Sequence, residues 1–449
     1  MKKNYLLGMA LMASLSFNSC DKEVVYVQDG TGVESVADGA QIITLQVENG
    51  GDGLATRAGR PLYSAEAKQT IENVKLWICD GAGNVIKYVK EISDWNTDDV
   101  STVYTTGGHG RQTTIELKDA DKLAAGTYQI YAVGYSNSSA YTLTNVTNVT
   151  KESAFNVNMV LPCSTAGEEI FAGQMGLTVE KGKGFKKPVV LNRQVAGAFA
   201  YVKDIPFMEG AKYLKLVASA QNQSLILGNF NSVDLTGNGS GNDANVKYVV
   251  NGTNGKSGSE TYVISTIDLN KWFTAIKDDN GDNLIDAGEN WKNPRRPSGS
   301  PAAGTYPTFQ KGSAFGGEFV IPFAHVDGKQ TLTLQLTNAD GTTVLRSWKV
   351  NLGSADEQLK QTITCWNSGS TNWSAPLSGE SSSTYSLVRN HLYGIGTRMN
   401  DEANPEKPGV DPDPNPENPN DKPESLNNKQ ELVLKVNDNW EVIHGMELD

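Results

Sequence analysis

The chain has 449 residues and a formal net charge of −12. This length is enough for two or three domains, each able to bury its own core. The acidic balance, together with the lack of a basic helix or a long Lys/Arg cluster, argues against a nucleic-acid binder and against docking on an anionic membrane surface.

The first twenty residues, MKKNYLLGMALMASLSFNSC, have two Lys, then an apolar run, then small residues and Cys20. This order is typical of a secretory signal peptide, and the run is too short to span a membrane as a helix. Its end resembles a lipobox, which predicts that Cys20 is the lipidated first residue of an exported lipoprotein held at a membrane by acyl chains. Phe17 and Asn18 depart from the usual lipobox, so a plain secreted protein stays open as the alternative.

The next segment, residues 21–57, reads as a propeptide with one strand-like run at residues 40–48. Alternation gives this run an apolar face made of Ile43, Leu45 and Val47. We expect this strand to fill a groove of the domain that follows. Its removal would leave an open apolar slot and unpaired backbone groups.

The stretch GDGLATRAGRP follows this run and contains two Arg residues. Ala58 and Gly59 leave room for a protease after Arg57, whereas Pro61 protects the bond after Arg60 from most trypsin-like enzymes. We therefore predict cleavage between Arg57 and Ala58. An ordinary solvated loop Arg is the alternative.

Strand-like runs separated by turn signals fill residues 58–206 and 207–398, and long helical periodicity is nearly absent. Residues 73–92 and residues 331–350 each predict a β-hairpin around a short polar turn. Such runs at short spacing predict an all-β protein made of two β-sandwich domains, with a boundary near Pro206.

Three cysteines remain after the signal peptide: Cys79, Cys163 and Cys365. An odd number excludes a complete disulfide framework. Cys79 lies in the apolar run VKLWICD, so we expect it to be a buried, inert thiol.

Residues 278–289, DDNGDNLIDAGE, match the calcium-loop pattern of oxygen ligands. The predicted ligands are Asp278, Asn280, Asp282, the Leu284 carbonyl, Asp286 and Glu289. Asn283 replaces the usual turn Gly, which is tolerable because Asn visits left-handed conformations more readily than most residues. Only the preceding residues look helical, so half an EF-hand is the most the pattern supports. Calcium would stiffen an insertion, a solvated acidic turn is the alternative, and no cofactor is expected to be required.

Residues 399–430 are rich in Pro, Asn and Asp, which predicts a semi-rigid polyproline II spacer rising about 3.1 Å per residue. The tail, residues 431–449, is apolar at alternate positions again. These apolar positions are Leu432, Leu434 and Val436, followed by Trp440 and Val442. An apolar strand on a tether needs a partner, so we expect it to fill the slot that residues 40–48 leave in another copy.

The free energies involved explain why exchange of one strand for another requires proteolytic cleavage of the chain. Burial of about four to six apolar side chains at roughly 1.5–3 kcal/mol each gives on the order of 10 kcal/mol before ordering costs. A strand that stays attached to its own domain has a high effective concentration, however, and resists displacement. Cleavage after Arg57 would remove that advantage.

In their order along the chain, these motifs resemble the fimbrillin family of Bacteroidales type V pili, which includes the major and minor fimbrial subunits of Porphyromonas. The motifs are the lipoprotein signal, LATRAG, VVLNRQVAGAFAYV, LVRNHLYGIG and VNDNWEVI, so the resemblance covers nearly the whole chain. It implies an outer-membrane lipoprotein precursor, an Arg-specific maturation protease, and two transthyretin-like β-sandwich domains. It also implies donor-strand assembly into adhesive fibres at the cell surface, with other copies and fimbrial anchor and tip proteins as partners.

Carried over to this chain, the resemblance places the cut at Arg57–Ala58 and the donor strand at residues 431–449. A cut site together with a free tail indicates a shaft subunit, and a fimbrial tip or anchor subunit stays open as an alternative. The signals for an enzyme are weak, because no GxSxG or HExxH motif occurs and the histidines show no metal-type spacing. These histidines are His109, His325, His391 and His444.

A surface glycan-binding lipoprotein is the competing class. Its stacking platforms would be exposed tryptophans, for which the candidates are Trp272, Trp291, Trp366 and Trp373. Aromatic residues in β-sandwiches are more often part of the core, and this class explains neither the tail nor the Arg57 site.

Overall fold

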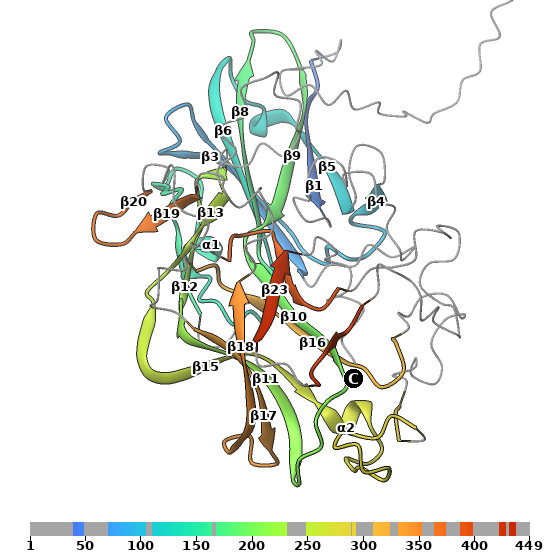
Figure 1. Cartoon of the computed structure of the whole chain (residues 1–449). Coiled ribbons are helices and arrows are strands. Elements are labelled where there is room, and N and C mark those ends of the chain that lie inside the picture. Colours follow the sequence, from blue (N-terminus) through green and yellow to red (C-terminus); the bar gives the residue numbers. More distant parts are fainter. Residues whose placement is uncertain are drawn as a thin grey trace, which may run out of the picture. The chain divides into compact units, whose positions relative to one another are not determined.

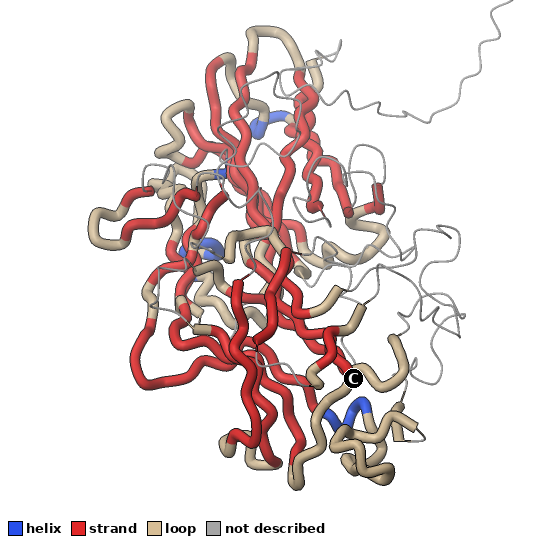
Figure 2. Tube along the Cα trace, viewed as in Figure 1, coloured by secondary structure: helices blue, strands red, loops and turns tan. Residues whose placement is uncertain are grey.

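The fold is all-β, as the sequence predicts, in a computed structural model of the chain (Figures 1 and 2). The helical elements within the described residues are α1 (Thr144–Thr147), α2 (Leu269–Trp272) and a 3₁₀ turn, Asp119–Asp121, and Phe230 is also in 3₁₀ conformation. No helix in this part of the chain is long and apolar enough to cross a membrane. The structure describes residues 39–48, 71–104, 110–163, 168–230, 248–288, 290–292, 309–323, 331–352, 363–373, 387–397, 422–427 and 431–436.

The first sheet has eight strands in the order β3-β2-β6-β8-β9-β1-β5-β4. The strands are β1 (Gln41–Glu48), β2 (Asn73–Asp80), β3 (Ile86–Ile92), β4 (Thr102–Tyr104), β5 (Gly110–Leu117), β6 (Gly126–Tyr135), β8 (Phe171–Val179) and β9 (Phe185–Arg193). The antiparallel pairing of β2 with β3 confirms the predicted hairpin at residues 73–92. Asp80 stabilises its turn, because its carboxylate accepts a hydrogen bond from the Asn84 backbone N–H at 2.9 Å.

This sheet folds into a sandwich. Strands β8 and β9 pair only at Phe171↔Arg193 and Ala172↔Asn192, so the layer β3-β2-β6-β8 separates from the layer β9-β1-β5-β4 beyond that point. Alternate residues of the two layers meet in one apolar core, as half-buried strands with period-two alternation require.

The second sheet follows the path β15-β11-β17-β18-β23-β21-β10-β16, with β22 paired to β10. Its strands are β10 (Ala196–Lys203), β11 (Ala211–Gln221), β15 (Lys256–Asp268), β16 (Ala314–Val320), β17 (Leu332–Asn338), β18 (Val344–Leu352), β21 (Leu392–Ile395), β22 (Glu424–Ser425) and β23 (Glu431–Val436). The pairing of β17 with β18 confirms the predicted hairpin at residues 331–350.

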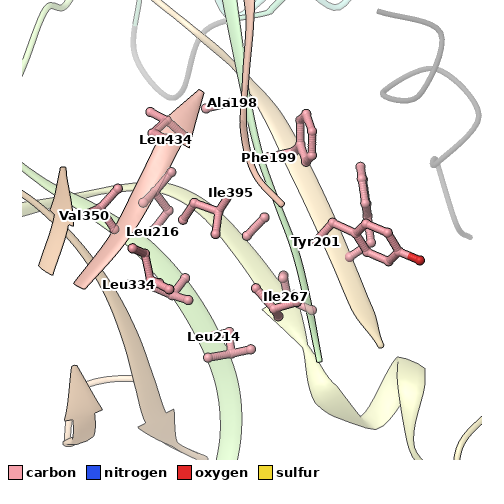
Figure 3. Close-up of a cluster of buried hydrophobic side chains, with 14 of the residues drawn as sticks. Ala198, Phe199, Tyr201, Leu214, Leu216, Ile267, Leu334, Val350, Ile395 and Leu434 are labelled. Carbon is pink, nitrogen blue, oxygen red and sulfur yellow. The ribbon is translucent and has the colours of Figure 1, made fainter. Parts of the chain in front are cut away.

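This second sheet curls around its own core, part of which is drawn in Figure 3. Its two edge strands approach each other, since a Cβ atom on Gly316 in β16 would lie 2.8 Å from the Ile267 side chain in β15. Leu434 of the tail strand β23 lies among the buried side chains of this core, with Leu216 and Leu334 (Figure 3).

Strand β10 marks where the chain changes from one sheet to the other. The predicted boundary near Pro206 assigns β10 to the first domain, yet β10 pairs with β16, β21 and β22 of the second sheet. The change of sheet therefore falls between Arg193, the last residue of β9, and Ala196, the first residue of β10.

A third apolar cluster joins the two sheets. Strand β2 contributes to both sides, because Val74, Leu76 and Ile78 enter the sandwich core while Trp77 and Cys79 enter this third cluster. The opposite side of the cluster comes from a small sheet of β7 (Val160–Pro162), β12 (Ser224–Ile226) and β14 (Gly252–Thr253). A second small sheet is formed by β13 (Tyr248–Val250), β19 (Ile363–Asn367) and β20 (Asn372–Trp373).

The cysteines follow the sequence prediction. Cys79, Cys163 and Cys365 are thiols rather than disulfides, and Cys79 is fully buried. Burial raises the pKa of the Cys79 thiol to about 12, and the nearby Asp80 charge acts in the same direction. Because the thiolate is the reactive form, Cys79 is an inert core residue.

Candidate functional site

Strand β1 lies inside the first sheet rather than at its edge. It pairs in parallel with β9 and antiparallel with β5, so both of its backbone edges are hydrogen bonded. Ile43, Leu45 and Val47 have no exposed surface and face the sandwich core. The structure thus places all three residues of the predicted displaced strand in a central slot of the sheet.

The polar side chains of β1 are buried on both of its faces, because Gln41 shares the face of Ile43 whereas Thr44 and Gln46 lie on the other. The Gln41 side chain donates to the Leu123 carbonyl at 2.9 Å and accepts from the Leu123 N–H at 2.7 Å. Gln46 donates to the Gln112 side chain at 3.1 Å. Thr44 is 1% exposed, and its hydroxyl oxygen lacks a hydrogen-bond partner within the described residues. An unpaired buried hydroxyl weakens the seat of β1 by about 1–3 kcal/mol.

The start of β1 is fixed by a close backbone approach. The Phe185 N–H donates to the Ala40 carbonyl at 2.7 Å, and any side chain on Gly184 would collide with that carbonyl. Gly39, just before the strand, has a φ of +70°, a left-handed conformation that favours glycine.

The predicted processing sites lie outside the described residues. Cys20, Arg57 and Ala58 all fall in residues 1–38 or 49–70, and Arg57 follows β1 along the chain before the next described residue, Ile71. Lipidation and cleavage therefore stay predictions.

The tail strand is seated in its own second sheet. Strand β23 runs parallel to β18 and antiparallel to β21, and Leu432 and Leu434 are 1% and 2% exposed. The Val436 backbone pairs with Tyr393, whereas Trp440 and Val442 lie outside the described residues. The sequence predicts a tethered strand without a partner in its own chain. In the structure the strand has two partners, β18 and β21, in its own chain.

The residues that flank the Pro-rich spacer are bonded to each other. Thr397 and Lys422 form an antiparallel bridge with two backbone hydrogen bonds. After it, β22 pairs with β10, and the Leu426 N–H donates to the Lys203 carbonyl at 2.9 Å. Leu426 is fully buried, so the root of the tail is anchored only a few residues before β23.

The seats of β1 and β23 share one pattern. Each strand lies between one parallel and one antiparallel neighbour. Each also buries alternate apolar residues, with Ile43 and Leu45 in one seat and Leu432 and Leu434 in the other. The two segments therefore meet similar steric and hydrogen-bonding demands.

The predicted calcium loop folds tightly on itself. The Asp278 carboxylate accepts from the Gly281 N–H at 2.7 Å and from the Asn283 N–H at 2.9 Å, and Asp282 accepts from the Leu284 N–H at 2.8 Å. Asn283 has a φ of +63°, the left-handed conformation expected there.

Two further predicted ligands of this loop, Asn280 and Asp286, are also placed. The Asn280 side chain donates to Asp282 at 3.1 Å, Asp286 accepts from the Gly288 N–H at 2.8 Å, and Glu289 lies outside the described residues. Within those residues, no group of three or more His, Cys, Asp or Glu side chains is arranged to hold a metal ion. Calcium binding stays a prediction.

The candidate glycan-stacking tryptophans divide into two kinds. Trp272 is buried in the second core, and Trp291 packs against it with its indole N–H on the Ser313 carbonyl at 2.8 Å. Trp366 and Trp373 are half-exposed and pair across β19 and β20, with ring centroids 5.2 Å apart. Of the four candidate tryptophans, only this second pair could offer an exposed stacking surface to a sugar ring.

Sequence reasoning missed a buried polar network near the change of sheet. Arg389 donates to the Gln194 side chain at 3.1 Å, and the Asn390 N–H donates to the Val195 carbonyl at 2.8 Å. His391, the one histidine within the described residues, is buried beside them. The motifs LNRQ and LVRN carry these residues, but a motif does not tell which strands will meet.

No protein-family model and no curated protein matches the chain. Among solved structures, the fimbrial anchor protein Mfa2 from Porphyromonas gingivalis is 10% identical, with 78% of this chain and 99% of that chain covered and a TM-score of 0.34. The tip fimbrial protein Mfa3 from the same organism is 10% identical, with 79% and 93% covered and a TM-score of 0.37. A fimbrial assembly protein from Parabacteroides distasonis is 12% identical, with 82% and 93% covered and a TM-score of 0.35. Because these TM-scores are below 0.5, we argue function from the strands of this chain alone.

Proposed function

We propose that the chain is a structural subunit of a cell-surface fimbrium, that it polymerises by protease-activated donor-strand exchange, and that it has no enzymatic role. The observation that carries the proposal is the seat of β1. A strand from the N-terminal part of the chain occupies a central slot, and a predicted protease site follows it. Cleavage after Arg57 would turn an internal strand into a separate peptide.

Loss of β1 would create a strong binding site. Three fully buried side chains, Ile43, Leu45 and Val47, contribute roughly 1.5–3 kcal/mol each. Two backbone edges, on β5 and β9, would also lose their partners. An incoming strand with apolar residues at alternate positions restores both the apolar burial and the backbone hydrogen bonds by β-strand addition.

The tail has the required pattern. When Leu432 is placed on Ile43, Leu434 falls on Leu45 and Val436 on Val47. The residues between them, Val433 and Lys435, then take the places of Thr44 and Gln46. Val433 would put an apolar side chain where β1 has an unpaired hydroxyl.

The seat of β23 in its own sheet explains why cleavage sets the direction. To reach another copy, β23 must give up the burial of Leu432 and Leu434, at roughly 1.5–3 kcal/mol each. It gains a similar amount in the slot of β1, so exchange between intact chains is close to balanced. Removal of the attached β1 strand takes away the intramolecular competitor and drives assembly.

The remaining parts of the proposal follow the sequence. Cys20 would hold the precursor at the outer membrane, and an Arg-specific protease would release it for assembly. A slot and a donor strand on one chain suit a shaft subunit, with other copies, an anchor and a tip protein as partners. A tip subunit, which needs no usable tail, and an anchor, which keeps its first strand, are the alternatives.

A surface glycan-binding lipoprotein is the second candidate, favoured by the half-exposed pair Trp366 and Trp373. Limited trypsin digestion of the purified precursor separates the two. A product that begins at Ala58 and forms filaments in electron microscopy supports the fimbrial subunit, and an Arg57→Ala variant should stay monomeric. A cleaved chain that keeps β1 bound and stays monomeric contradicts it.

A further inference from the structure

A cavity of about 160 Å³ opens where β8 and β9 separate. Its wall comes from both strands and from two later segments of the chain. Asn192, Met175 and Val190 line it from the first sheet, and Phe230 and Asn390 line it from the later segments. The cavity therefore combines apolar side chains with amide groups, a mixture typical of small-molecule sites.

Two buried arginines belong to the wall, and both are engaged by the protein. Arg193 is fully buried and forms an ion pair with the fully buried Glu169, with Nε and Oε1 2.7 Å apart. Arg389 donates to the carbonyl oxygens of Gly228 and Asn229 at 3.0 and 2.7 Å, besides its bond to Gln194. The charge of Arg193 is therefore balanced by a carboxylate of the protein itself, and Arg389 is bound to protein oxygens.

The amide of Asn192 is different. Its side-chain oxygen is buried and lacks a hydrogen-bond partner within the described residues. The neighbouring amide of Gln194 is satisfied, because it donates to the carbonyls of Ala172 and Asn192 at 3.2 and 2.8 Å. A buried acceptor without a donor is unfavourable unless a donor comes from outside the protein.

We propose that this cavity is a binding subsite for one neutral, hydroxyl-rich sugar unit. A hydroxyl group can donate to the side-chain oxygen of Asn192, while Phe230, Met175 and Val190 offer apolar contact to the C–H face of a sugar ring. The volume corresponds to about five water molecules, which matches a single monosaccharide better than a longer glycan.

The inference goes beyond the proposed function, because a subunit can bind a sugar whether or not it polymerises. It gives a fimbrial subunit a chemical class of adhesion target. A failure of filament assembly would leave sugar binding unchanged, and a failure of sugar binding would leave assembly unchanged.

The test uses saturation-transfer NMR on the uncleaved chain with glucose, galactose, mannose, fucose and N-acetylglucosamine, followed by titration of any binder. We expect at least one to bind, and Asn192→Leu to weaken it about tenfold, as for the loss of one hydrogen bond. The matched control is Thr337→Val, which also removes a buried hydroxyl without a described partner, in the second sheet.

Three results would overturn the proposal. No sugar of the panel binds at millimolar concentration; binding is equal in Asn192→Leu and the parent chain; or Trp366→Phe abolishes binding while Asn192→Leu does not, which assigns it to the exposed tryptophan pair. Because the Asn192 oxygen has no described partner to lose, Asn192→Leu should keep the thermal midpoint of the parent, which shows that the variant is folded.

Discussion

Thr397 and Lys422 donate backbone hydrogen bonds to each other at 2.8 and 2.7 Å, although 24 residues, 398–421, lie between them in the sequence. The two residues that flank the proline-rich segment are therefore held together beside the second sheet. With Leu426 buried just beyond, the donor strand starts from a fixed root instead of the far end of a long spacer.

This closure predicts that the spacer is dispensable for assembly. Replacement of residues 399–420 by a Gly/Ser loop of about six residues should keep the thermal midpoint or raise it slightly, because a shorter loop costs less entropy to close, at about 0.6 kcal/mol per halving of length. Filaments counted by electron microscopy after trypsin should be as abundant as for the parent chain. Loss of filaments from a folded variant would mean that the span of the spacer is needed.

Release of β23 from its own sheet is a second requirement of the account. Lys349 and Glu431 are paired in register on exposed parts of β18 and β23, with Nζ and Oε1 3.5 Å apart. A Lys349→Cys/Glu431→Cys variant, made with Cys365→Ser, should form a disulfide that locks the strand in place. Under oxidising conditions the cleaved chain should stay monomeric, and reductant should restore filaments.

The matched control for this lock is the Lys349→Cys single variant with Cys365→Ser, which should assemble with or without reductant. Filaments from the fully oxidised double variant would show that β23 stays in its own sheet during assembly. The donor would then have to come from residues after Val436.

The unpaired hydroxyl of Thr44 weakens the binding of β1 in its slot. We therefore expect β1 to be released, and filaments to assemble, faster than with an apolar residue at this position. Thr44→Val replaces a buried hydroxyl with a methyl group of similar shape, so we expect a gain of about 1 kcal/mol in the free energy of unfolding of the precursor. After cleavage β1 should leave about fivefold more slowly, since 1 kcal/mol is a factor of about five. Thr44→Ser, which keeps the hydroxyl, is the control. An unchanged release rate, followed by mass spectrometry of the freed peptide, would contradict this seat for β1.

Thiol chemistry checks the burial of Cys79. Its pKa is raised from 9.0 to about 12, so the folded chain keeps the thiol neutral where the unfolded chain ionises it. This contribution to stability is fully present below pH 9 and is lost as the pH rises from 9 to 12. At pH 8 to 9 iodoacetamide should modify the half-buried Cys365 well before Cys79. Equal rates in the folded chain would show that the β2 region opens.

Period-two alternation was enough to predict β1, β23, both hairpins and the all-β class, because it reports which face of a strand is buried. It does not report which strands become neighbours. The seat of β23 therefore escaped prediction, as did the assignment of β10 to the second sheet, since the run AGAFAYV signals burial on both faces only. The bridge of Thr397 with Lys422 uses backbone atoms alone, so no side-chain pattern announces it.

The polar network around Arg193 and Arg389 shows the same limit. The sequence places both arginines in short polar motifs flanked by apolar runs, and a charge that becomes buried there needs a partner. Their partners, Glu169 and the carbonyls of Gly228 and Asn229, come from elsewhere in the chain, and only the fold brings them together. The cavity beside them could not be foreseen for that reason.

The most direct test of the central claim is a disulfide between copies. If Leu434 of one copy takes the place of Leu45 in another, Val433 takes the place of Thr44 and lies opposite Thr114 of β5. Val433 is 39% exposed and Thr114 is also exposed, so a Val433→Cys/Thr114→Cys chain with Cys365→Ser should fold normally. We expect mild oxidation to give a ladder of covalent multimers on denaturing gels after trypsin cleavage at Arg57, and none before it. Filaments that form without this cross-link would contradict the exchange of β1 for β23.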